Sequence, residues 1–137
     1  MKAFTIGEAS PYTHRTIPRD VAERAITEYK EKFVSQKRAF GEATEDGNWP
    51  DLSVVNLTNV SHTVTDIQIE GNDVMVNATI LDTPKGLEIQ QLLDNKCPLR
   101  IGWRGIGCVD ETNTVKDEGF ELVSFDILRD DEPAIER

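Results

Sequence analysis

Apolar residues recur at helical spacing near the start of the chain. Within residues 18–34 they form one stripe on a helix of 3.6 residues per turn: Val21, Ala22, Ala25, Ile26, Tyr29 and Phe33. This stripe predicts an amphipathic helix packed on a core. A second helix is predicted to begin at residues 82–84 (DTP), because a short polar side chain caps a first turn and proline is tolerated there. Its inward face is expected to comprise Leu87, Leu92 and Leu93.

The middle of the chain has the apolar and polar pattern of strands, at residues 54–60, 63–69 and 74–80. Gly71, Asn72 and Asp73 separate the last two runs, and these residue types accept the positive backbone angles of tight turns. We therefore predict an antiparallel hairpin there. Two more strands are predicted at residues 99–106, where glycines indicate bends, and at 120–128, a run expected to be buried on both faces.

These elements together predict an α+β fold, a small and mostly antiparallel β-barrel with two flanking helices. A length of 137 residues suits one domain with its own core, so we expect a single domain over residues 1–137. Residues 1–15 are expected to be an N-terminal arm and residues 130–137 an acidic C-terminal tail. No apolar run approaches the roughly 20 residues that span a bilayer, so no membrane partner is predicted.

Charge and cysteine content narrow the classes of ligand. A net charge of -10 repels a phosphate backbone and argues against nucleic acid as the main partner. Cys97 and Cys108 show neither a CxxC spacing nor a cluster with histidine, so we predict no metal site and no cofactor. Two reduced thiols are expected, while a disulfide within one chain or between chains stays open.

Five blocks of sequence resemble the maturation proteases of tailed-bacteriophage proheads. They are residues 15–21 (RTIPRDV), 55–64 (VNLTNVSHTV), 80–86 (ILDTPKG), 99–105 (LRIGWRG) and 120–128 (FELVSFDIL). The blocks follow the order in which that family carries its helix start, its V-N-L-x-N-V-S-H-x-V and ILDTP-x-G segments and its last two strands. The resemblance implies a prohead-protease-like fold.

The same resemblance places the family's catalytic residues at positions that differ here. Gly102 and Trp103 stand where the family has its serine pair, and Glu45 stands where it has the histidine of G-E-L-D-H-P. The family's acid is matched by Asp126 or Asp130. A hydroxyl becomes nucleophilic only beside a base that a third group orients. With two of three parts absent from these positions, we expect the chain not to be an enzyme.

Other side chains with reactive groups are weak catalytic candidates. His62 follows Ser61, but without a serine near position 102 we expect it to be structural. Cys108 lies further along the same strand than the family's nucleophile, which disfavours a cysteine protease. His14 lies in a polar stretch and is expected to be exposed.

Three residues are candidates for contacts. Trp49 is expected to anchor its loop or meet a partner, and Trp103 to fill or project from the former cleft. Arg104 is expected to pair with a carboxylate, with Asp126 as one option.

The function predicted from the sequence is that of a non-enzymatic bacteriophage virion protein, a capsid-associated decoration, cement or assembly component. Its partners would be phage capsid or other virion proteins, in a homo-oligomer or lattice, and its location the virion, assembled in the host cytoplasm. Two alternatives stay open. One is an active prohead maturation endopeptidase with altered catalytic residues, and the other is a pseudoprotease assembly chaperone or a tail or neck protein.

Overall fold

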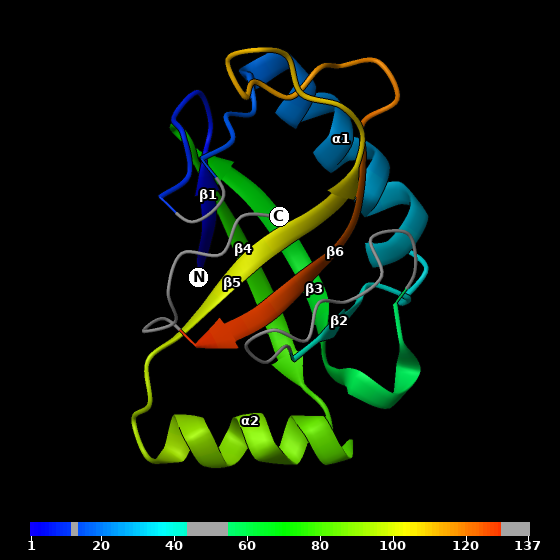
Figure 1. Cartoon of the computed structure of the whole chain (residues 1–137). Coiled ribbons are helices and arrows are strands. Elements are labelled where there is room, and N and C mark those ends of the chain that lie inside the picture. The colour runs from blue at the N-terminus through cyan, green and yellow to red at the C-terminus, as the bar shows by residue number, and fades with distance from the viewer. Residues whose placement is uncertain (12–13, 44–54, 130–137) are drawn as a thin grey trace.

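The computed structural model describes residues 1–11, 14–43 and 55–129 (Figure 1). The elements in chain order are β1 (Lys2–Thr5), α1 (Arg19–Tyr29), a π-helical turn (Lys30–Val34), β2 (Phe40–Glu42), a 3-10 turn (Leu57–Asn59), β3 (Val60–Glu70), β4 (Asp73–Ile80), α2 (Pro84–Asp94), β5 (Leu99–Ile106) and β6 (Glu121–Arg129). None of the helices described is long and apolar enough to cross a membrane.

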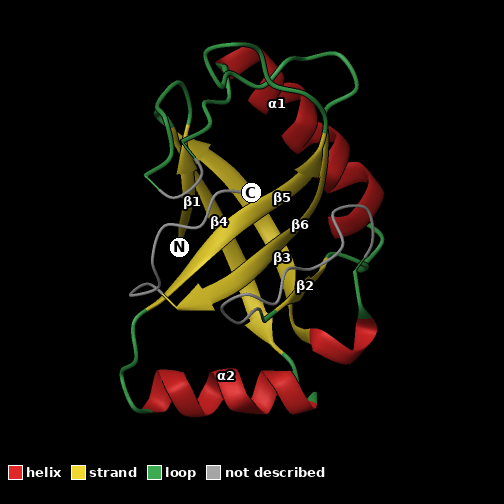
Figure 2. Cartoon of the chain, viewed as in Figure 1, coloured by secondary structure: helices red, strands yellow, loops and turns green. Residues whose placement is uncertain are grey.

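The strands form two antiparallel sheets that curl toward each other as a half-barrel (Figure 2). One sheet has the order β1–β4–β3–β2 and the other pairs β5 with β6. The sheets join where β2 meets β6, through a bridge between Ala43 and Ile127 and a hydrogen bond of 3.0 Å from the Glu42 N–H to Asp126 Oδ1. The predicted α+β fold, with an antiparallel curled sheet and two helices, is confirmed.

The predicted hairpin is also present. β3 pairs with β4 from Glu70 opposite Asp73 to His62 opposite Ile80, and Gly71 in the turn has φ of 64°. The strand expected over residues 54–60 is wrong for residues 55–59, because 57–59 form the 3-10 turn and β3 begins only at Val60; residue 54 lies outside the described residues. Asn56 causes this, because its side-chain oxygen accepts the N–H of Thr58 at 3.1 Å and so favours a local turn over strand pairing.

Helix α1 buries the stripe that the sequence predicts. Val21, Ala22, Ala25, Ile26 and Tyr29 are buried. The Tyr29 ring packs edge-on against Phe125 of β6, with ring centroids 5.1 Å apart and an interplanar angle of 80°. α1 therefore fixes β6 at Phe125, while β2 meets β6 at the next two residues, Asp126 and Ile127.

Helix α2 begins where the sequence predicts. Thr83 is the N-cap, and its Oγ1 accepts the N–H of Gly86 at 2.9 Å, while Pro84 occupies the first turn. The Thr83 hydroxyl also donates to the carbonyl oxygen of Val60. The cap thus ties the start of α2 to the start of β3.

The inward face predicted for α2 is wrong for Leu87 and Leu93, which are 52% and 39% exposed. Leu92 is half-buried, and the large buried side chain of this helix is Ile89. The helix lies across one end of the strands (Figure 1), where it contacts β3, β4 and the 3-10 turn. Sequence spacing predicts a stripe, but which side of a short helix faces the body depends on how its ends are attached.

Candidate active site

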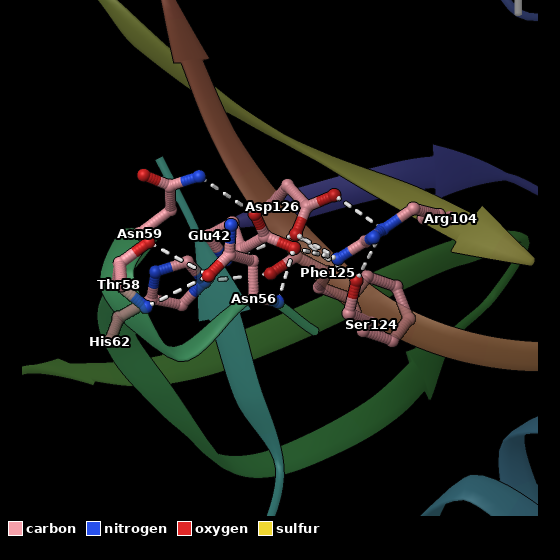
Figure 3. A network of polar contacts seen from close by, with 9 residues as sticks. All are labelled: Glu42, Asn56, Thr58, Asn59, His62, Arg104, Ser124, Phe125 and Asp126. Atoms are coloured by element: carbon pink, nitrogen blue, oxygen red, sulfur yellow. Dashed lines mark hydrogen bonds and ion pairs between the residues drawn. The ribbon is translucent and has the colours of Figure 1, made fainter. Parts of the chain in front are cut away.

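Polar side chains are buried together where β2, β3, β5 and β6 converge. Within the described ranges the buried polar residues are Glu42, Ser61, His62, Arg104, Ser124 and Asp126, each at most 1% exposed. Figure 3 shows the contacts among most of them. Buried polar groups need partners, because leaving one unsatisfied costs about 1–3 kcal/mol.

Arg104 of β5 holds two carboxylates. Its Nη2 lies 2.8 Å from Glu42 Oε2, and its Nε lies 3.0 Å from Asp126 Oδ2. Nε also donates to Ser124 Oγ at 2.9 Å, and the Ser124 hydroxyl donates to Asp126 Oδ1 at 3.0 Å. The expected pairing of Arg104 with Asp126 is confirmed. With a buried guanidinium, Arg104 is not available as a surface contact in this state.

Residues 56–59, just before β3, hold the Glu42 carboxylate in place. The backbone N–H of Asn56 donates to Glu42 Oε2 at 3.1 Å, and the Asn59 side-chain amide donates to Oε1 at 3.3 Å. Both asparagines belong to the block VNLTN. That block therefore supplies donors to a buried carboxylate, which explains in physical terms why the fold uses this sequence there.

Ser61 and His62 form a second contact in the same region. Ser61 Oγ lies 2.7 Å from His62 Nδ1, and His62 Nε2 lies 2.7 Å from the carbonyl oxygen of Phe125. A carbonyl oxygen only accepts, so Nε2 carries the hydrogen, and Nδ1 of the neutral ring accepts the Ser61 hydroxyl. The Ser61 hydroxyl, the His62 base and the Phe125 carbonyl that orients this base thus form a continuous chain of contacts, as serine-type hydrolysis requires.

Burial keeps His62 neutral. Loss of hydration is the largest influence and lowers the pKa of His62, whereas the hydrogen bond to the Phe125 carbonyl and the charge of Asp126 act to raise it. The net pKa lies below the ordinary 6.5. An imidazole that is neutral at pH 7 is able to take a proton from a hydroxyl.

This pKa shift predicts a loss of stability in acid. The unfolded state binds more protons than the folded state once the pH falls below about 6.5. The contribution of His62 is therefore fully present above that pH and is lost as the pH falls through the lowered folded pKa. Urea unfolding between pH 5 and pH 8 measures it: the His62→Gln variant should show a shallower fall than the wild-type chain. Equal slopes would contradict the prediction.

The two cysteines and His14, the other reactive groups considered from the sequence, are not part of this buried cluster. Cys108 is exposed, Cys97 is half-buried and both are free thiols. Among the residues the structure describes, no hydrogen bond links either thiol to a histidine. His14 is exposed, as expected.

Of the positions that correspond to catalytic residues of the family, only Gly102, Trp103 and Asp126 lie within the described residues. Gly102 pairs with Asp126 across β5 and β6. Trp103 is half-buried and packs edge-on against Phe120, with centroids 5.6 Å apart. Glu45, Trp49 and Asp130 lie outside the described residues, as does the expected acidic tail.

Sequence reasoning did not find two members of this site, Glu42 and Ser124, which carry no motif that marks them as functional. The adjacency of Ser61 and His62 was visible in the sequence, but the direct contact between their side chains was not. In chemical class, the geometry defines a candidate serine-hydrolase site.

Comparison with known proteins agrees with this class. The sequence profile of the family described as prohead core protein serine protease matches residues 3–129, and the chain belongs to this family. The prohead core protein protease of Enterobacteria phage T4 is 29% identical over 128 residues, which cover 87% of this chain and 57% of that protein. The chain thus spans a little over half the length of that relative.

A solved structure gives the same fold. The bacteriophage T4 capsid assembly protease superposes with a TM-score of 0.82 at 23% sequence identity, covering 95% of this chain and 79% of that one. At this identity the superposition establishes the fold alone.

The expectation that the chain is not an enzyme is contradicted. Its family is described as a serine protease family, and the phage T4 relative is named a protease. The expectation relied on positions 45, 102 and 103. It also treated His62 beside Ser61 as structural, whereas the structure brings the Ser61 hydroxyl and the His62 imidazole into contact on β3.

Proposed function

We propose that this protein is an endopeptidase that cleaves proteins of a bacteriophage prohead during capsid assembly. The observation that carries the proposal is the 2.7 Å contact between Ser61 Oγ and His62 Nδ1 in a chain of the prohead core protease family. The partners follow from the names of its relatives and are capsid or prohead core proteins. The place of action is the assembling particle in the host cytoplasm.

In this proposal Ser61 is the nucleophile and His62 is the general base. As Ser61 Oγ bonds to the carbonyl carbon of the scissile peptide, its proton passes to His62 Nδ1. The imidazolium then gives that proton to the amine nitrogen as the C–N bond breaks, and the acyl group stays on Ser61. A water molecule, deprotonated by the same nitrogen, next attacks the acyl carbon, and the imidazolium returns the proton to Ser61 Oγ as the ester bond breaks and the acid leaves. The Phe125 carbonyl and the charge of Asp126 both favour the imidazolium, since each acts to raise the pKa of His62.

Access to Ser61 requires movement. Ser61 and His62 are both 0% exposed, so a peptide reaches the hydroxyl only after a covering element has been displaced. The start of α2 is held close to this strand: a Cβ on Gly86 would lie 3.0 Å from the Ser61 carbonyl oxygen, and the Thr83 hydroxyl donates to Val60. The described state is therefore a resting state in this mechanism.

Incubation with prohead proteins tests the proposal. The purified chain is mixed with the prohead core and capsid proteins of its own phage, and mass spectrometry follows the fragments. Wild-type protein should produce discrete fragments, and His62→Gln should slow their formation by about a hundredfold or more, the usual effect of losing a general base.

A matched control excludes thiol chemistry. Cys108→Ala should cleave at the wild-type rate, because the Cys108 thiol has no hydrogen-bonded histidine among the described residues. No fragments from the wild-type chain, or fragments formed equally fast by His62→Gln, would contradict the proposed function.

A further inference from the structure

The ring of His62 reaches across a neighbouring strand (Figure 3). His62 on β3 is the pairing partner of Gly41 on β2, yet its Nε2 bonds to the carbonyl oxygen of Phe125 on β6, at 2.7 Å. The hydrogen bond therefore passes close to Gly41. A Cβ built on Gly41 would lie 2.1 Å from His62 Nε2 and 2.2 Å from the Phe125 oxygen. A side chain at position 41 would occupy the space of this bond.

The backbone that follows Gly41 is attached to β6. The N–H of Glu42 donates to Asp126 Oδ1 at 3.0 Å, and Ala43 bridges to Ile127. Asp126 is in turn held by Arg104, which also binds the Glu42 carboxylate. These contacts resist a movement of β2 away from β6, so a methyl group at position 41 would force the His62 ring and the Phe125 carbonyl apart and break the hydrogen bond between them.

We propose that Gly41 is a positioning residue whose missing side chain lets His62 bond to the Phe125 carbonyl and thereby fixes the tautomer that accepts the Ser61 proton. The inference rests on the proposed roles of Ser61 and His62. A neutral imidazole carries one ring hydrogen. While Nε2 donates to Phe125, Nδ1 is the acceptor, whereas a ring freed from Phe125 is able to place its hydrogen on Nδ1 and donate to Ser61 instead.

The consequence for catalysis is specific. A histidine in the wrong tautomer cannot remove the serine proton, and the known cost of such a change in serine proteases reaches about ten-thousandfold in kcat. For Gly41→Ala we expect kcat to fall by about a hundredfold or more with KM little changed, since Gly41 is not proposed to touch substrate.

Nitrogen NMR of the His62 ring tests the inference directly. With ¹⁵N-labelled full-length chain above pH 7, the wild-type spectrum should show a protonated Nε2 and an unprotonated Nδ1. Gly41→Ala, checked for folding by circular dichroism, should lose this single tautomer. Gly102→Ala is the matched strand-glycine control, because its Cβ would meet its nearest neighbour, the far end of the Arg100 side chain, at 3.3 Å. It should leave the His62 signals unchanged.

The outcomes separate the inference from the proposed function. A wild-type ring protonated at Nδ1 overturns the inference even where Gly41→Ala does not fold. A folded Gly41→Ala that keeps the wild-type tautomer and kcat also overturns it, while leaving a cleaving enzyme in place. The expected tautomer in a wild-type chain that cleaves no prohead protein supports the geometry and contradicts the proposed function.

Discussion

Replacing Ser61 by alanine is expected to lower the rate of prohead-protein cleavage by at least about a thousandfold. Its hydroxyl is in contact with His62 Nδ1 at 2.7 Å, and removing it removes the atom proposed to carry the acyl group. Fragment formation is measured by mass spectrometry under single-turnover conditions. The variant keeps the strand, so circular dichroism should show the wild-type fold.

A surface serine provides the matched control for this variant. Ser35 is exposed, and its hydroxyl donates to the Glu31 carbonyl at 2.7 Å at the end of the π-helical turn. Ser35→Ala should cleave as fast as the wild-type chain. A Ser61→Ala protein that folds and cleaves within about tenfold of the wild-type rate would exclude Ser61 as the nucleophile, since an enzyme without its nucleophile loses far more.

Replacing Arg104 by methionine is expected to lower the free energy of unfolding by about 3–5 kcal/mol. The substitution removes the buried cation that lies within 3.0 Å of the carboxylates of both Glu42 and Asp126, so that both stay buried without the positive charge of Arg104. A domain is stable by about 5–15 kcal/mol, so this variant should be close to unfolding at room temperature. Urea titration followed by tryptophan fluorescence measures the change.

An exposed ion pair is the control for Arg104. Lys30 lies 3.8 Å from Asp66 with side chains that are 45% and 37% exposed. Lys30→Met should change the free energy of unfolding by less than about 1 kcal/mol, because solvent screens such a pair. A loss below about 1 kcal/mol in Arg104→Met would show that the buried network does not stabilise the fold.

The sequence predicts those parts of the fold that depend on local patterns. The stripe from Val21 to Tyr29 follows from helical spacing, and the turn at Gly71 follows from the need for a positive φ. Local patterns did not reveal that Lys2–Thr5 is an edge strand, because that strand is defined by its pairing with β4 far along the chain. The exposed Leu87 shows the same limit for a helix held at one end.

The candidate site was less predictable because its contacts cross several strands. The pairing of Arg104 with Asp126 could be expected from two neighbouring strands, but Glu42 joins them from β2, separated from Arg104 by 62 positions in the chain. The prediction of a lost activity compared residue letters at positions 45, 102 and 103 and treated His62 as structural. The family to which the chain belongs contradicts that prediction.

Covalent labelling of the nucleophile is the most direct test of the proposed mechanism. The full-length chain is incubated with a fluorophosphonate in the presence of its prohead proteins, so that a serine oxygen displaces fluoride and retains the phosphonyl group. After digestion, mass spectrometry should find the added mass on Ser61 in the wild-type chain and not in His62→Gln. An adduct on another residue while cleavage proceeds, with Ser61 unmodified, would contradict the assignment of Ser61 as the nucleophile.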